Sequence, residues 1–156
     1  MPTVVIPNTL TKIGSQCFMQ CYKLSSIVLP DSLTEIEVLG FGYVHGIYHM
    51  ELPESVSTLG ANVFQGMKNL TKIKIANPNG VTINGAAETE TRTVFKLFED
   101  CNNLKHIFVG WPRSYADNVK GYKSEDGSLY LWKVPNPETV QIHFSDDESY
   151  NHYDEY

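Results

Sequence analysis

Apolar residues recur along this chain with a period of twenty-three residues. The pairs Ile6-Pro7, Leu29-Pro30 and Leu52-Pro53 keep this spacing, and Ile75-Ala76 follows at the same interval without the proline. The other aligned columns are Leu10, Leu33 and Val56; Ile13, Ile36 and Leu59; Phe18, Phe41 and Phe64; Cys21, Val44 and Met67; Leu24, Ile47 and Leu70; and Ile27, Met50 and Ile73. One such repeat cannot bury its own apolar face, so the period predicts a solenoid of stacked repeats that share one core.

A fourth repeat follows with extra residues in front of it. Phe98, Cys101, Leu104, Ile107 and Val109 each lie thirty-four residues after their counterparts in the third repeat, which is eleven more than the period. The insertion lies near residues 78–93, where glycines and a run of polar residues occur. Insertions in repeat arrays form loops on one face. We expect a plain surface bulge here, with a binding element as the alternative.

Each repeat contains two kinds of local pattern. In residues 24–30, a period of two places Ile27 and Leu29 on one side, which predicts a short half-buried strand ended by Pro30. In residues 17–24, apolar residues stand at the first, second, fifth and eighth positions, a spacing that predicts one or two helical turns. Residues 10–14 form a short extended piece closed by a glycine, and Gly60 and Gly85 recur at that corner. Stacked repeats would place the phenylalanines in a ladder.

The repeated unit Ile-Pro-x-Ser/Thr-Leu-Thr-x-Ile-Gly-x-x-x-Phe-x-x-Cys-x-x-Leu resembles the BspA-like leucine-rich repeat, also called the Treponema pallidum type, over residues 4–110. The resemblance implies an α/β repeat fold: a right-handed leucine-rich-repeat solenoid with short parallel strands on the concave face and short helical turns. It also implies proteins at the surfaces of bacteria and some parasitic protists, which act in adhesion and in protein or glycan binding. The family carries no catalytic motif. The second repeat departs from the pattern, with Glu37 at the corner and Gly40 before its phenylalanine.

We therefore divide the chain into three parts: a solenoid over residues 1–110, a C-terminal cap over residues 111–145 and an acidic tail over residues 146–156. The cap is predicted to be β-rich, with strands at residues 128–134 and 139–144, because a solenoid end exposes a core layer that must be covered. An aromatic platform for sugars is the alternative, formed by Trp111, Tyr115, Tyr122, Tyr130 and Trp132. The tail holds five acids and no Lys or Arg, and we expect it to be solvated rather than a Ca²⁺ site or a docking segment.

Composition excludes several classes of protein. Apolar residues make up 42% of the chain and charged residues 19%, so the chain is not disordered overall. No run of eighteen apolar residues occurs, which predicts no membrane insertion. The net charge of −6 argues against nucleic acid as a partner. The three cysteines, Cys17, Cys21 and Cys101, align with apolar columns and are expected to be buried thiols.

The strand pattern also identifies a candidate binding strip. If Ile27 and its equivalents point inward, the neighbouring positions form two outward columns, and the later repeats place polar side chains there. The predicted binding residues are Ser26, His49, Glu51, Lys72, Lys74, His106 and Phe108. Glu51 and Lys74 would be cross-strand neighbours, close enough for an ion pair. An ordinary solvated sheet face is the alternative.

No other chemistry is indicated. His49 and His106 would lie about 10 Å apart, two strand spacings, which is too far for a shared metal. Neither a nucleophile elbow nor a phosphate-binding loop occurs, so we expect no catalytic residues, no metal and no cofactor. The sequon Asn69-Leu70-Thr71 is expected to be accidental, because Leu70 is a predicted core residue.

These observations predict a non-catalytic module that binds a protein or glycan ligand and belongs to a surface adhesin-like protein. A structural spacer without its own ligand is one alternative, and an enzyme with its site in the C-terminal third is another. Residues 4–7 already form a strand in mid-array, so we expect a longer natural array or a partner contact at this uncapped N-terminal rung. No signal peptide is visible, so a cytoplasmic location is the alternative to the cell surface or secretion.

Overall fold

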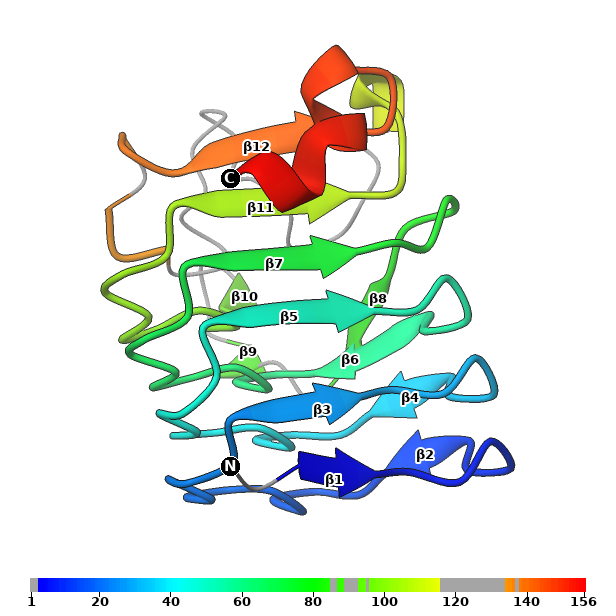
Figure 1. Cartoon of the computed structure of the whole chain (residues 1–156), viewed down its shortest axis with the longest axis vertical. Coiled ribbons are helices and arrows are strands. Elements are labelled where there is room, and N and C mark those ends of the chain that lie inside the picture. Colours follow the sequence, from blue (N-terminus) through cyan, green and yellow to red (C-terminus); the bar gives the residue numbers. More distant parts are fainter. Residues whose placement is uncertain (1–2, 85–86, 89–92, 95, 116–133, 137) are drawn as a thin grey trace.

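The twenty-three-residue period becomes the turns of a solenoid, in which each turn, here called a rung, adds strands to two parallel sheets (Figure 1). The computed structural model describes residues 3–84, 87–88, 93–94, 96–115, 134–136 and 138–156. The strands of the front face, here the front sheet, are β1 (Thr3–Val5), β3 (Ser26–Val28), β5 (His49–Leu52), β7 (Lys72–Ile75), β11 (His106–Val109) and β12 (Gln141–Phe144). The second sheet contains β2 (Lys12–Ile13), β4 (Glu35–Ile36), β6 (Thr58–Gly60) and β8 (Thr82–Asn84).

The remaining elements are short. Strands β9 (Ala87–Glu88) and β10 (Thr93–Val94) form an antiparallel pair within the predicted insertion, whose range also includes β8. In the described residues that follow, the 3₁₀ helices are η1 (Arg113–Tyr115) and η3 (Glu148–Glu155). The insertion is therefore partly regular, because β8 continues the second sheet beside β6.

The front sheet is a parallel ladder with one interruption. β5, β7, β11 and β12 pair in register, so that His49, Lys72, His106 and Gln141 lie in one row. β1 pairs with β3 in the same way. β3 and β5 contact each other but do not pair, and Figure 1 shows them side by side on the same face. The predicted strands and their spacing are confirmed, and this interruption follows the second repeat, which departs from the sequence pattern.

The front sheet does not end at the predicted boundary near residue 110. β12, which was expected to belong to a separate cap, pairs in parallel with β11 and places Ile142 beside Ile107. β12 follows β11 at an interval of thirty-five residues, so the twenty-three-residue period does not predict this rung. The predicted strand at residues 139–144 is confirmed, whereas residues 128–133 of the other predicted strand lie outside the described residues.

Hydrogen-bonded turns replace the predicted helical turns in residues 17–24. The Cys21 amide donates to the Phe18 carbonyl and the Leu24 amide to the Cys21 carbonyl, both at 3.1 Å. Residues with positive φ flank each phenylalanine on both sides: Gln16, Leu39, Asn62 and Lys96 before it, and Gln20, Tyr43, Gly66 and Asp100 after it. A left-handed residue cannot continue a right-handed helix, so two per rung keep each segment a series of turns.

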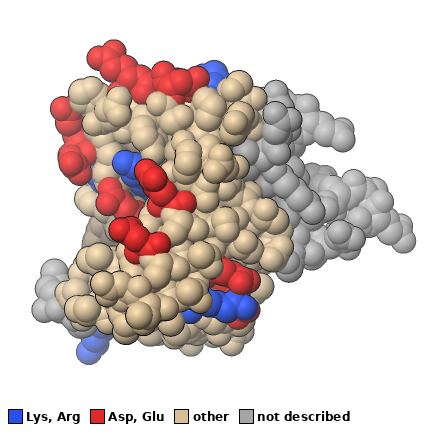
Figure 2. Space-filling model, turned by 90° about the vertical axis from the view of Figure 1, so that its right-hand side faces the viewer, with Lys and Arg blue, Asp and Glu red and all other residues tan. Residues whose placement is uncertain are grey.

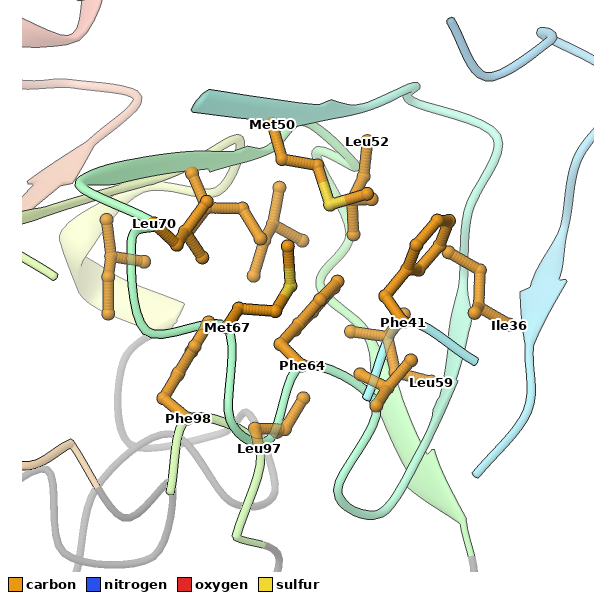
Figure 3. Packing of buried hydrophobic residues seen from close by; sticks show 14 of the residues in the cluster. Ile36, Phe41, Met50, Leu52, Leu59, Phe64, Met67, Leu70, Leu97 and Phe98 are labelled. Atoms are coloured by element: carbon orange, nitrogen blue, oxygen red, sulfur yellow. The ribbon is translucent and has the colours of Figure 1, made fainter. Parts of the chain in front are cut away.

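The predicted phenylalanine ladder forms the centre of the core (Figure 3). Ring centroids are 5.2 Å apart from Phe18 to Phe41, 6.5 Å from Phe41 to Phe64 and 5.6 Å from Phe64 to Phe98, and all three pairs are stacked. Side chains from both sheets and from the turns surround these rings, among them Met50, Leu52, Leu59, Met67 and Leu70. The apolar columns of the sequence therefore correspond to the interior of the solenoid.

Polar side chains link consecutive rungs as well. The Asn69 side-chain amide donates to the His45 carbonyl at 2.8 Å, and Asn103 donates in the same way to Lys68 at 2.7 Å. Asn69 belongs to the sequon, and its amide is engaged in holding two rungs together.

The cysteines differ in exposure. Cys101 is buried, its thiol donates to the Phe64 carbonyl at 3.1 Å, and burial raises the pKa of the thiol to about 12. Cys21 is half-buried, but Cys17 is exposed, so the prediction of burial is wrong for Cys17. The equivalent positions Gly40 and Val63 are buried in inner rungs, whereas Cys17 belongs to the first described rung, which has a neighbour on one side only.

Two glycines at the same corner allow a test of how closely the rungs stack. A Cβ atom at Gly60 would lie 2.2 Å from the Val38 nitrogen, whereas one at Gly14 would meet nothing closer than Glu37 Oε2 at 3.8 Å. We predict that Gly60→Ala lowers the free energy of unfolding by about 1–3 kcal/mol, because backbone atoms of the adjacent rung cannot move aside. Gly14→Ala is the matched control, with a change within about 0.5 kcal/mol in urea unfolding. Equal losses for the two variants would contradict this packing.

Candidate binding face

The seven predicted binding residues lie on the front sheet in the two outward columns that the sequence pattern gives. One column contains Ser26, His49, Lys72 and His106, and the other contains Glu51, Lys74 and Phe108. Their exposure divides them into two groups. Ser26, His49 and Glu51 are exposed and Lys74 is half-exposed, whereas Lys72 and Phe108 are buried and His106 is half-buried. The C-terminal residues cover the second group.

The acidic tail, residues 146–156, folds back over the upper rungs of the front sheet (Figure 1). Its helix η3 contacts both β11 and β12, and Tyr153 is only 8% exposed. The prediction of a solvated tail is therefore wrong. Tyr150, Tyr153 and Tyr156 are spaced by three residues, and all three rings lie against Phe108 although the helix is interrupted at His152. This tyrosine spacing is the sequence feature that indicates a docked tail, whereas the five acids of the tail favour the prediction of a solvated segment.

Two lysines hold the tail through its tyrosines. Lys72 Nζ donates to the Tyr153 carbonyl at 2.7 Å and lies 4.1 Å from the centroid of the Tyr153 ring. Lys74 Nζ lies 4.9 Å from the Tyr150 ring centroid. Lys74 and Glu51 are register partners as expected, but among the described side chains they form no ion pair within 4 Å. A cation above an aromatic face is attracted by the ring's electron density, more strongly where water is excluded.

An aromatic and imidazole cluster forms the other half of the tail contact. The Phe108 ring stacks on His143 at 4.2 Å between centroids, and Tyr153 meets Phe108 edge-on at 5.0 Å. The Tyr156 ring lies 4.7 Å from that of His106. Phe108 had been predicted to form the rim of an open strip. It is instead fully buried under the tail.

The two histidines of this cluster are hydrogen-bonded to each other. His106 Nδ1 lies 3.0 Å from His143 Nε2, and His143 Nδ1 lies 2.7 Å from Ser149 Oγ in the tail. Burial lowers the pKa of both imidazoles. The charges of Lys105 and Lys72 lower that of His106 further, while Asp147 raises that of His143. The two rings therefore titrate as a coupled pair, with the neutral forms favoured when the tail is docked.

The start of the tail is anchored by Arg113. Both carboxylate oxygens of Asp147 accept from Arg113 Nη2 at 2.9 Å, and Oδ2 also accepts from the Phe144 amide at 2.9 Å. Partial burial raises the pKa of Asp147, but these hydrogen bonds outweigh it and lower the pKa overall. The backbone amide of Arg113 donates to Asp146 at 3.0 Å. The acids at the start of the tail therefore hold it in place.

The open part of the front sheet contains a groove at the interruption between β3 and β5. It encloses about 850 Å³. Its lining residues are Ile27, Val28, Leu29, Asp31, His49, Glu51, Leu52, Pro53, Glu54, Ser55, Lys74, Ala76, Tyr153 and Asp154. Four carboxylates thus stand beside Lys74 and His49. Figure 2 shows the side at which the front strands end, where acidic side chains gather in the upper part.

Other kinds of site receive less support from the described residues. No group of three His, Cys, Asp or Glu side chains in the described ranges converges as metal ligands would. No helix in the part of the chain that the structure describes is long and apolar enough to span a bilayer. Of the alternative aromatic platform, Trp111 is fully buried and Tyr115 is exposed. Tyr122, Tyr130 and Trp132 lie outside the described residues.

Comparisons with known proteins agree with this architecture. A family model described as BspA type leucine-rich repeat region (6 copies) matches residues 1–111. No curated protein matches the chain. The crystal structure of the pneumococcal vaccine antigen PcpA is similar, with a TM-score of 0.64 and 25% identity over 91% of this chain. A leucine-rich repeat protein from Bacteroides ovatus ATCC 8483 has the same fold, with a TM-score of 0.62 and 23% identity over 91% of this chain. The chain spans 30% of the length of each of these structures.

The histidine pair makes docking of the tail dependent on pH. The pKa values of His106 and His143 lie below the ordinary 6.5 when the tail is docked, so the undocked form binds more protons in acid. Docking is then fully favoured above about pH 6.5, and it weakens by up to about tenfold per proton per pH unit below that. We predict that protease cleavage within residues 146–156 accelerates between pH 7.5 and 5.

His143→Gln should flatten this profile, whereas His45→Asn should leave it unchanged, because the His45 ring lies against Tyr22 rather than against the tail. Cleavage corrected for the protease's own pH profile is the measurement. A tail that remains equally protected at pH 5 would contradict the role of the pair.

Proposed function

This chain belongs to the BspA-type leucine-rich repeat family, and on that premise we propose that it is a non-catalytic, protein-binding module of a cell-surface protein. The observation that carries the proposal is the groove between β3 and β5 on the front sheet. Everywhere else along the sheet adjacent described strands pair directly, so this is where the surface is open to a partner.

The groove has the chemistry of a site for basic and apolar side chains. Asp31, Glu51, Glu54 and Asp154 provide four carboxylates against the single lysine Lys74. Beside them, Val28 is 74% exposed and Val5 in the same column is 87% exposed. A partner segment with a lysine or arginine next to an apolar residue would complement both features, and opposite charge would speed its association.

A protein ligand fits this groove better than a glycan. Stacking of a sugar needs an accessible aromatic face, and the one aromatic lining residue, Tyr153, is buried under its own helix. The exposed tyrosines Tyr22 and Tyr48 are not among the groove's lining residues. Glycan binding therefore remains the second candidate, to be separated by experiment.

The chemistry of the nucleophiles supports a non-catalytic role. Within the described residues Ser55 Oγ, the hydroxyl in the groove, has no hydrogen-bond partner and so no base that would activate it. The Cys101 thiol, with its pKa raised to about 12, is protonated at neutral pH and therefore a poor nucleophile. Both observations favour recognition over catalysis.

We place the protein at the cell surface or in the secreted fraction. The family membership supports this location, and so does the description of the similar PcpA as a vaccine antigen. Because the chain spans 30% of each similar structure, we further propose that it functions within a longer array. Fractionation of source cells, with the protein found in the cytosol alone, would contradict the surface assignment.

The groove can be tested with two matched substitutions. We predict that Val28→Asp lowers the affinity for a protein ligand by at least about tenfold, because it places a charge where an apolar contact is expected. Thr82→Asp, on the exposed face of β8 in the second sheet, should leave the affinity unchanged. The measurement is a screen of the immobilised chain against arrays of extracellular proteins and glycans, with each ligand re-measured on both variants.

Three results would count against the proposal. If ligands are found only on the glycan array, the chain binds glycans rather than proteins. A protein ligand whose affinity is unaffected by Val28→Asp would place the site elsewhere. No ligand on either array would support the structural spacer.

A further inference from the structure

The strip beneath the tail has the form of a peptide-binding surface. Lys72, His106 and Phe108 point away from the solenoid core, and among the described residues the tail is what covers them. The stacked rungs have their own interior of phenylalanines, leucines and isoleucines, which does not include these side chains. The strip is therefore a surface of the solenoid that has an occupant, rather than a part of its core.

The contacts to the tail are those that a tyrosine-bearing peptide supplies. Lys72 Nζ donates to the backbone carbonyl of Tyr153 and lies over the face of its ring, and Lys74 Nζ lies over the ring of Tyr150. The Tyr153 ring meets the Phe108 ring edge-on, and the Tyr153 hydroxyl donates to the Met50 carbonyl at 3.4 Å. Two tyrosines spaced by three residues thus engage two lysines that are spaced by two residues on the outward face of β7.

Lys72 shows that the strip is suited to an anionic partner. It is 5% exposed, and among the described residues no carboxylate pairs with its ammonium group. A buried cation is stabilised most by an anion, and the carbonyl and ring of Tyr153 provide only partial charges. A peptide that brought a carboxylate to this point would satisfy Lys72 better than the tail does.

The attachment of the tail is uneven along its length. Asp147 holds its start through Arg113, but the helix that follows is interrupted at His152, whose φ of −110° and ψ of 28° are not helical. The Asp147 side chain makes no cap bond to the helix, and Tyr156 is exposed on its outer side. Undocking of residues 148–156 would require no change in the solenoid.

We propose that the strip formed by Lys72, Lys74, His106 and Phe108 binds acidic peptide segments of partner proteins that carry two tyrosines spaced by three residues, and that residues 148–156 occupy this strip in cis. The occupant in the same chain competes at a high effective concentration. It therefore lowers the apparent affinity for a partner in proportion to the fraction of molecules whose strip is free. The strip and the groove share Lys74, and Tyr153 of the tail also lines the groove, but the proposal does not require a ligand in the groove.

The test uses a fluorescent peptide with the sequence of residues 146–156 and the full chain. Tyr153→Ala in the protein removes the residue that docks the tail and leaves the strip unchanged. We expect this variant to bind the peptide at least about tenfold more tightly than the wild-type chain in fluorescence anisotropy, because its strip is free more often. Tyr22→Ala, which removes an exposed tyrosine outside the strip, is the matched control and should bind as the wild type does.

Two further variants identify the surface. Adding Lys72→Met to Tyr153→Ala should lower the affinity for the peptide to that of the wild-type chain or below it, because the cation is lost. A peptide in which the alanine replaces the second tyrosine should bind at least about tenfold more weakly, since that ring makes the lysine and phenylalanine contacts.

A second route frees the tail without altering the strip, in case the first variant is poorly folded. Asp147→Ala removes the anchor to Arg113 and should raise peptide affinity in the same direction. Folded variants, verified by circular dichroism, that bind no more tightly than the wild type would overturn the proposal. So would equal binding of the peptide that lacks the second tyrosine. Dimerisation of the Asp147→Ala chain without added peptide, in which the tail keeps all three tyrosines, would assign the strip to the tail of a second copy and would also overturn the proposal.

Discussion

No single turn of this chain can bury its own phenylalanine, and the rest of the structure follows from that constraint. A rung presents Phe41 on two sides, and only the rungs before and after it, through Phe18 and Phe64, remove that ring from water. Burial of apolar area is the main favourable term in folding, so the rungs must stack in one register. The two parallel ladders satisfy the hydrogen-bonding groups of the backbone in the stacked rungs. The outward residues are then placed at fixed intervals on the front sheet.

The parts of the structure that local pattern governs could be predicted from the sequence. Alternation around Ile27 located the strands, and the period located the phenylalanine ladder and both outward columns. The turns were mistaken for helix because apolar spacing does not reveal the sign of φ at Gln16 or Gln20. Left-handed backbone at such residues is imposed by the stacking of the rungs, which no short window of sequence contains.

The covering of the binding strip by the tail could not be predicted from local pattern. It depends on contacts between residues 81 apart in the chain, such as that between Lys72 and Tyr153. Lys72 belongs to an outward column as predicted, but an outward side chain is exposed only where no other segment covers it. The tail's charge indicated solvation, whereas three tyrosine rings and an anchor at Arg113 outweigh that tendency. The groove was missed for a related reason, because an interruption of the ladder between β3 and β5 is a property of two rungs together.

The ladder of β5, β7, β11 and β12 tolerates large differences in the length of chain between its strands. β7 follows β5 after twenty-three residues, β11 follows β7 after thirty-four and β12 follows β11 after thirty-five, yet each residue still pairs with its counterpart in the next strand. The entropic cost of closing a loop grows only with the logarithm of its length, so extra chain between rungs adds little to the cost of folding. The connections between rungs are therefore natural points of growth, where a repeat protein can acquire a new segment, or a designer can graft one, while the scaffold on either side keeps its alignment.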